Sequence, residues 1–166
     1  MDIWTERLER RHLPLVERWF ERNSGQMTTN DLPLEIGDLT LWFEKYSSDS
    51  ERLDCLVSVY ETPVGIAGLR KCAGQESVAE SVAELYLLLG ETNYNPLRTA
   101  TYATLRMLDR AFLECGFNRV NVQVCREHEE YLDALKRMGF LKTAEKDERI
   151  NAFVEKKVYL DRKYLF

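Results

Sequence analysis

Histidines, paired cysteines and long apolar runs are scarce in this sequence of 166 residues. Only His12 and His128 could serve as imidazole ligands, and the four cysteines show no C-x-x-C spacing. We therefore expect no metal site, zinc in particular, and four free thiols. The charged N-terminal stretch has no apolar run long enough for a signal peptide or a membrane span. A cytoplasmic protein without a membrane partner is the expectation.

The sequence also has no dense basic patch and no linker rich in proline, glycine and serine. With a formal net charge of −5, it is a poor match to a phosphate backbone, so we expect no nucleic-acid partner. The acidic balance mildly favours a cationic acceptor such as an amine. Hydrophobic residues make up 45% and charged residues 31%, which predicts one globular domain spanning residues 1–166.

Residues 82–117 are the stretch around which the rest of the chain is organised. They read as an apolar strand, Val82–Leu89, then a polar loop and an amphipathic helix of about four turns that ends at Gly116. The first amides of a helix point outward unpaired, and the helix dipole favours negative charge there. A strand that leads into such a helix predicts an anion-binding turn.

The remaining periodicity predicts an α/β fold with a mixed central sheet flanked by helices, in the order β-α-α-β-β-β-α-β-α-β-β. The ligand site should lie at the carboxyl end of the strand Val82–Leu89. Residues 23–46, which contain a loop and an aromatic-rich helix, are a candidate flap. Strands are expected at 3–8, 52–59, 64–70, 82–89 and 118–125, with two more within 141–165, and helices at 14–22, 38–46, 100–115 and 127–138.

This element order, the V-A-E-L strand and the Gly139-Phe140 stop of the last predicted helix together resemble the GNAT superfamily of N-acyltransferases. The resemblance covers nearly the whole chain. It implies that a bulge in the strand before the long helix offers free amides to the acetyl carbonyl and the pantetheine arm. It also implies that a loop of pattern Q/R-x-x-G-x-G/A wraps the pyrophosphate of acetyl-CoA.

Carried over to this sequence, the resemblance places the pyrophosphate loop eleven residues after Glu84. Arg98 replaces the first glycine of the loop, and Asn95-Pro96 also reads as a helix N-cap followed by proline at the first helical position. Arg98 then either supplies a guanidinium to the phosphates or marks a damaged site. The implied cofactor-binding residues are Leu88, Leu89, Gly90, Asn95, Pro96, Leu97, Arg98, Thr99, Ala100, Thr101 and His128.

Glu84 is the candidate general base, because acetyl transfer requires a deprotonated amine and a carboxylate near the bulge can remove its proton. A solvent-facing strand residue is the alternative interpretation. The tyrosine that the resemblance implies as acid falls on Leu135, so Tyr131, one turn away, is the substitute candidate, with packing as the alternative. His128 stands where the family motif has asparagine.

The expected function is acetyl transfer from acetyl-CoA to a primary amine of a small molecule or a peptide, by direct attack. The alternative is a GNAT-fold binding or regulatory protein that has lost its phosphate loop. A longer acyl donor is a third possibility. An exposed strand edge near the C-terminus would suit a homodimer.

Overall fold

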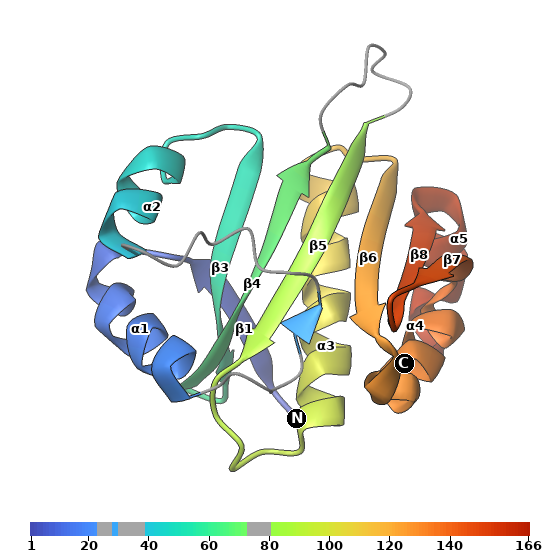
Figure 1. The fold of residues 1–166 in the computed structure, drawn as a ribbon. Coiled ribbons are helices and arrows are strands. Elements are labelled where there is room, and N and C mark those ends of the chain that lie inside the picture. The colour runs from blue at the N-terminus through green and yellow to red at the C-terminus, as the bar shows by residue number, and fades with distance from the viewer. Residues whose placement is uncertain (23–27, 30–38, 73–80) are drawn as a thin grey trace.

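The computed structural model describes residues 1–22, 28–29, 39–72 and 81–166. In it, a mixed eight-stranded sheet in the order β1-β3-β4-β5-β2-β6-β8-β7 carries helices on both faces (Figure 1). The strands are β1 Ile3–Arg7, β2 Thr28–Thr29, β3 Arg52–Val59, β4 Thr62–Lys71, β5 Val82–Leu89, β6 Arg119–Cys125, β7 Leu141–Lys146 and β8 Arg149–Glu155. The α-helices are α1 Leu13–Arg22, α2 Leu39–Tyr46, α3 Pro96–Asp109, α4 Glu129–Met138 and α5 Lys156–Arg162.

The predicted α/β order is confirmed, and the structure adds one strand and one helix to it. The added strand β2 lies within the predicted flap, whose other residues up to position 38 lie outside the described part of the chain. The added helix α5 was expected to belong to the last strand. It is helical because Tyr159 is buried against Phe112, with ring centroids 5.4 Å apart, and donates to the carbonyl of Leu105 at 3.2 Å.

Glycines end the two helices that were predicted to stop there. Gly116 has φ +76° and Gly139 has φ +109°, the left-handed conformation that glycine adopts without steric cost. Between α3 and Gly116 the chain makes one π-helical turn, Arg110–Glu114. The final hairpin turns at Asp147 and Glu148, both with positive φ.

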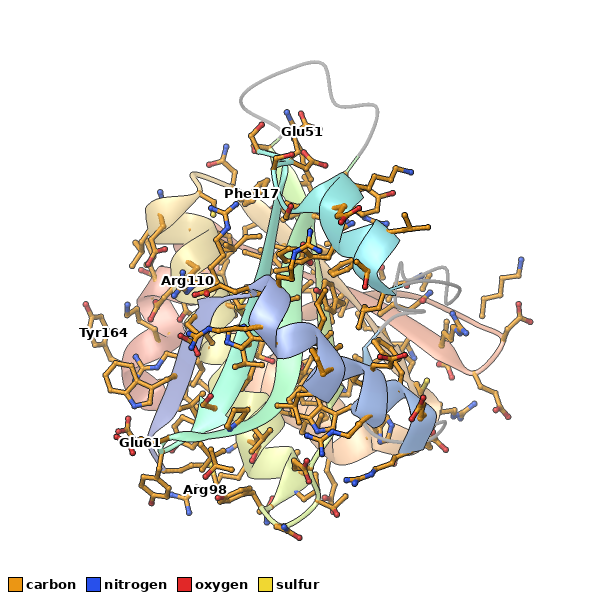
Figure 2. All side chains as sticks on the ribbon, turned by 90° about the vertical axis from the view of Figure 1, so that its left-hand side faces the viewer. Glu51, Glu61, Arg98, Arg110, Phe117 and Tyr164 are labelled. Carbon is orange, nitrogen blue, oxygen red and sulfur yellow. The ribbon has the colours of Figure 1, made fainter. Side chains whose placement is uncertain are left out.

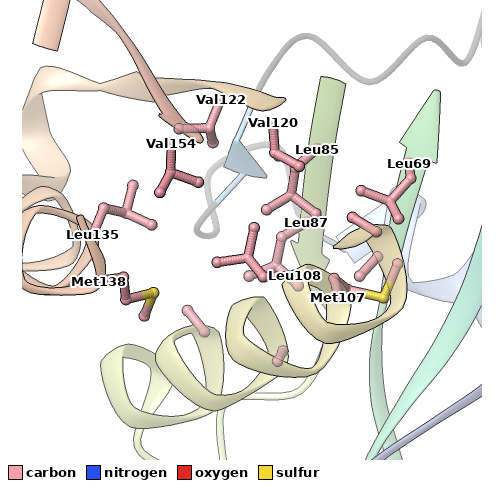
Figure 3. Packing of buried hydrophobic residues seen from close by; sticks show 14 of the residues in the cluster. Leu69, Leu85, Leu87, Met107, Leu108, Val120, Val122, Leu135, Met138 and Val154 are labelled. Atoms are coloured by element: carbon pink, nitrogen blue, oxygen red, sulfur yellow. The ribbon is translucent and has the colours of Figure 1, made fainter. Parts of the chain in front are cut away.

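Two hydrophobic layers cover the two faces of the sheet. The larger layer lies between the sheet and α3, α4 and α5, where Leu85 and Leu87 of β5 pack near Met107 and Leu108 of α3 (Figure 3). The smaller layer lies under α1 and α2 and is centred on Trp19, which is completely buried. Side chains alternate along β5, so odd-numbered residues join the larger layer, whereas Tyr86 and Leu88 join the smaller one.

The two edge strands of the sheet, β1 and β7, differ in how far their outer edges are covered by other parts of the protein. Arg106 of α3 donates to the carbonyl of Ile3 at 3.3 Å, and the guanidinium of Arg110 donates to both the carbonyl and the hydroxyl of Thr5. These arginines occupy carbonyls that strand β1 would otherwise present at an open edge. At the opposite end of the sheet, all six residues of β7 are exposed.

Among the described residues, no helix is both long enough and apolar enough to cross a lipid bilayer. The four cysteines are free thiols, as the sequence predicts.

Candidate active site

Strands β5 and β6 pair with each other over only the first half of their length. The parallel pairing joins Val82–Leu85 to Arg119–Val122. Beyond it, the short strand β2 stands between them and pairs antiparallel with Leu87 and Leu88 on one side and with Val124 on the other (Figure 1). The two strands therefore diverge as a V whose apex lies after Leu85 and whose open end lies at their carboxyl termini.

Two helical N-termini lie at the open end of this V. Helix α3 starts at Pro96, six residues after Gly90, and the 3₁₀ turn Arg126–His128 follows β6 directly and leads into α4. In open α/β sheets, ligands bind in the crevice at the carboxyl ends of diverging strands, where helix N-termini attract negative charge. The V is therefore the candidate active site, at the place that the sequence predicts.

The backbone donors of β5 differ from the expected ones. The amide of Gly90 donates to the carbonyl of Val64 on β4 at 2.7 Å. Because successive backbone amides in a strand alternate in direction, Leu88, which is opposite Ile66, also faces β4, and Leu87 and Leu89 face the V. The amides of Leu88 and Gly90 are thus turned toward β4, whereas those of Leu87 and Leu89 face the V, and cofactor binding by Leu89 stays a prediction.

The bulge implied by the resemblance is also absent from the described pairing of β5. The register between β4 and β5 runs without a shift from Gly65 opposite Leu89 to Lys71 opposite Ala83. An irregularity occurs one strand further away, between Val57 and Ser58 in the pairing of β3 with β4. The V therefore arises from divergence of β5 and β6 and not from a kink in β5 alone.

Gly90 is required for a packing reason. A Cβ atom at this position would lie 2.0 Å from Cγ of Trp19, closer than any real contact. The indole Nε1 of Trp19 donates to Oε1 of Glu91 at 2.9 Å, so α1 is attached to the end of β5 by a ring contact and a hydrogen bond. The glycine lets the buried ring of Trp19 lie directly on the backbone where the V opens.

Glu84 lies one residue before the apex of the V. By the alternation along β5, its side chain is on the same sheet face as Tyr86, the face that carries α1 and α2. Its Oε2 accepts a hydrogen bond from Arg70 Nη2 at 2.7 Å, and its side chain is 33% exposed. The carboxylate is therefore held in one orientation by Arg70 while it remains accessible to a substrate.

The residues that depart from the phosphate-loop pattern form the first turn of α3. Asn95 is the N-cap, and its Oδ1 accepts from the amide of Arg98 at 2.9 Å, while Pro96 has no amide hydrogen to offer. The predicted early start of the helix is thus observed. Thr99, Ala100 and Thr101 are buried, and the hydroxyl of Thr99 returns to the carbonyl of Asn95 at 2.9 Å. The turn therefore has fewer free amides than a glycine-rich loop would have.

Arg98 points away from the body of the protein. Its side chain is exposed at the end of the molecule where α3 begins (Figure 2), and its guanidinium lies 5.8 Å from the ring centroid of Tyr102, one turn further along. Leu97, beside it, is half-buried. The guanidinium is therefore open to solvent beside the N-terminal end of α3, where an anion could reach it.

Tyr131 is held inside the protein. It is completely buried, and its hydroxyl lies 2.6 Å from the Thr104 hydroxyl, across the contact between α4 and α3. Burial raises the pKa of the Tyr131 phenol well above its usual range. These surroundings are those of a packing residue and not of an acid open to a substrate. His128 lies at the N-terminal end of α4, with its Nε2 3.7 Å from Oε1 of Glu127.

Replacing Tyr131 by Phe tests this interpretation. The change removes one buried hydrogen bond and leaves the Thr104 hydroxyl without this partner, so the free energy of unfolding should fall by about 1–3 kcal/mol. The turnover number should stay unchanged in an acetylation assay. A loss of turnover without a loss of stability would indicate that Tyr131 takes part in the reaction.

Several residues that shape the V were not singled out from the sequence. Arg70, the partner of Glu84, lies at the end of the predicted strand 64–70, and antiparallel pairing of that strand with 82–89 places this end beside the start of the next strand. Trp19 and Glu91 lie 72 positions apart, and no local pattern connects them. Thr28 and Thr29 carry no signal beyond loop composition.

The fold was compared with known proteins. No family model and no curated protein matches the sequence. Among solved structures, spermidine N-acetyltransferase from Vibrio cholerae, in complex with CoA and spermine, superimposes with a TM-score of 0.72 at 15% identity, covering 95% of this chain and 98% of that one.

Two further structures extend this likeness. The N-acetyltransferase PseH from Campylobacter jejuni gives a TM-score of 0.65 at 13% identity, covering 93% of this chain and 98% of that one. FdhC, described as a nucleotide-linked sugar GNAT, gives 0.72 at 17% identity, covering 98% of this chain and 92% of that one. The protein therefore has the GNAT fold, as the order of its elements predicts.

Proposed function

We propose that the protein is an N-acetyltransferase that moves an acetyl group from acetyl-CoA to a primary amine. The observation that carries the proposal is the V between β5 and β6, with the accessible carboxylate of Glu84 at its apex and the start of α3 at its mouth. The GNAT fold of the solved N-acetyltransferases supports it. The amine would belong to a small molecule or a peptide.

The chemistry follows from groups at the apex. Glu84 takes the proton of the attacking ammonium, directly or through a water, so that the nitrogen lone pair can attack the thioester carbon. The C–N bond forms, the C–S bond breaks, and CoA leaves as a thiolate. The new amide nitrogen then releases its second proton, which protonates the thiolate directly or through water. Backbone groups of Leu87 and Leu89, which face the V, are placed to hold the pantetheine arm and the carbonyl oxygen. We assign no proton transfer to Tyr131, because it is buried.

Binding of a pantetheine arm along this edge requires β2 to give way. The pairing of Thr28 and Thr29 with β5 covers the same backbone groups of Leu87 that the arm would use. Pairing with β2 and binding of the pantetheine arm are mutually exclusive at this edge of β5. The net binding free energy is therefore reduced by the cost of breaking the pairing of two residues.

The diphosphate end of the cofactor fits the protein less well than the thioester end. Pro96 offers no amide hydrogen and the Arg98 amide is taken by Asn95. We propose that the Arg98 guanidinium supplies the charge-assisted hydrogen bonds that the missing amides would have made.

Arg98→Gln should therefore weaken acetyl-CoA binding by about tenfold or more, the range of a lost charge-assisted hydrogen bond. Isothermal titration calorimetry measures the change directly. Arg137→Gln is a matched control, because Arg137 lies in the last turn of α4, where its guanidinium contacts the ring of Phe166 at 5.9 Å. If the two variants bound acetyl-CoA with equal affinity, Arg98 would have no specific role in binding the diphosphate.

A second candidate function is a GNAT-fold binding or regulatory protein without transfer activity. The capped, proline-started α3 favours it, because a helix start with fewer free amides binds phosphate less well. Calorimetry with acetyl-CoA and with CoA separates the candidates. If neither acetyl-CoA nor CoA bound at millimolar concentrations, the enzyme assignment would be wrong. If longer acyl-CoA molecules bound more tightly than acetyl-CoA, the acyl donor would be a longer-chain acyl-CoA.

A further inference from the structure

Trp42 of α2 has a buried donor that nothing in the described part of the chain accepts. Its side chain lies against the sheet with 7% of its surface exposed, and its indole Nε1 has no hydrogen-bond partner among the described residues. An unpaired buried N–H costs about 1–3 kcal/mol, so native proteins rarely keep one. Trp19, by comparison, has its N–H satisfied by Glu91.

A small cavity adjoins this indole, between α2 and the strands β1 and β3. It has a volume of about 20 Å³ and is lined, among others, by Arg7, Trp42, Tyr46, Ser47, Arg52 and Asp54. A volume of this size holds a single water molecule or a monatomic ion and excludes phosphate or a carboxylic acid. Arg7 is exposed, so the cavity has a route to solvent on its side.

The Asp54 carboxylate in the cavity wall already accepts three hydrogen bonds. Asp54 Oδ1 accepts from the hydroxyl of Tyr86 at 2.5 Å and from Arg52 Nη2 at 3.1 Å, and its Oδ2 accepts from Arg52 Nε at 3.3 Å. Tyr86 reaches Asp54 across β4 because Gly68 lies between them, where a Cβ would come within 2.1 Å of the Tyr86 ring.

The donor capacity and the positive charge of the wall are in surplus. Arg52 is buried and uses two of its nitrogens on Asp54, with its guanidinium 4.6 Å from the Tyr46 ring centroid and 5.5 Å from that of Trp42. Arg7 donates to the carbonyl of Ser47 at 3.3 Å and keeps further N–H groups. Two guanidinium groups and one carboxylate leave a formal charge of +1. An anion accepts hydrogen bonds from these donors and also balances the charge, which a neutral water molecule does not, so the wall suits an anion better.

We propose that this cavity is a halide site, in which a chloride ion accepts hydrogen bonds from Trp42 Nε1 and from the guanidinium groups of Arg7 and Arg52. The ion would satisfy the buried indole, balance the surplus charge and attach α2 more firmly to β1 and β3. The site is separate from the V and does not depend on acetyl transfer.

Thermal unfolding in sodium chloride and in sodium gluconate at equal ionic strength tests the proposal. At a tenfold excess over its dissociation constant, chloride should raise the unfolding temperature by about 3–6 °C over gluconate, and the rise should saturate. Trp42→Phe removes the N–H and keeps an aromatic ring, so the chloride-dependent rise should disappear. Trp4→Phe is the matched control, because the Trp4 ring is exposed and its N–H donates to Asp2; there the rise should persist.

Arg7→Gln adds a variant at the exposed rim that should fold even if Trp42→Phe does not. It should weaken chloride by several-fold while leaving the protein folded. A bromide-soaked crystal should show an anomalous peak within hydrogen-bonding distance of Trp42 Nε1. A water at that position without bromide, or an equal chloride-dependent rise in wild type and Trp42→Phe, would overturn the proposal.

Discussion

Replacing Glu84 by Gln is expected to lower kcat/KM for the amine by about 10²–10⁴-fold, the contribution of a positioned general base. Gln keeps the size of the side chain and its hydrogen bond from Arg70 but cannot take the proton of an ammonium. The affinity for acetyl-CoA should not change, since Glu84 lies at the apex and the proposed diphosphate site is at the mouth of the V. Steady-state kinetics and calorimetry measure the two effects separately.

Glu91→Gln is the matched control for this experiment. Glu91 is a carboxylate that follows β5 by two residues, and its Oε1 accepts from Trp19 Nε1, a role that a glutamine oxygen can also fill. Its kcat/KM should remain near that of wild type. Unchanged turnover in Glu84→Gln would place the base elsewhere, and equal losses in both variants would indicate a general effect of charge near the strand.

The largest loss of stability is expected from Gly90→Ala. The added methyl would overlap the buried ring of Trp19, and neither the ring nor the strand can move freely, because Nε1 of Trp19 is bonded to Glu91 and the Gly90 amide is bonded to Val64. We expect a loss of about 3 kcal/mol, near the upper end for overpacked sites. Chemical denaturation measures it, and the unfolding temperature should fall by about 6–12 °C.

Gly116→Ala separates the steric effect from backbone strain. Gly116 has a positive φ of 76°, but a Cβ there would meet no atom within 4 Å. Its cost should be limited to the strain of a left-handed residue, about 1–2 kcal/mol. If Gly90→Ala were the milder of the two substitutions, the contact with Trp19 could not be the reason for glycine at this position.

The elements that the sequence predicts well are those in which local pattern and tertiary packing agree. β5 has the predicted bounds because its apolar run is buried on both faces, and α3 begins at Pro96 because Asn95 and Pro96 are favourable at their positions in any context. The sequence does not predict the helix α5, because Val158 and Tyr159 favour strands. Its conformation depends on the contacts of Tyr159 with α3, which local periodicity does not contain.

For the candidate site, the sequence predicts a region of the fold but not which backbone groups face it. The strand-to-helix order predicts where the V lies. Which amides of β5 face it depends on the pairing of Gly90 with Val64, a long-range register that one strand alone does not reveal. Tyr131 was a candidate because of its spacing from Leu135, and only the position of Thr104 on α3 shows that its hydroxyl is already engaged. Whether Glu84 acts as the base stays a prediction.

The arginine contacts on β1 have a consequence for how copies of this protein could join. A sheet with two free edges can add strands without limit, which leads to fibres. Here the carbonyl of Ile3 accepts from Arg106 of α3 and that of Thr5 from Arg110 of the π-helical turn, while β7 is exposed along its length. If two copies paired through β7, each end of the combined sheet would be a β1 strand whose outward carbonyls of Ile3 and Thr5 are already hydrogen-bonded. Growth of that kind would stop at a closed pair.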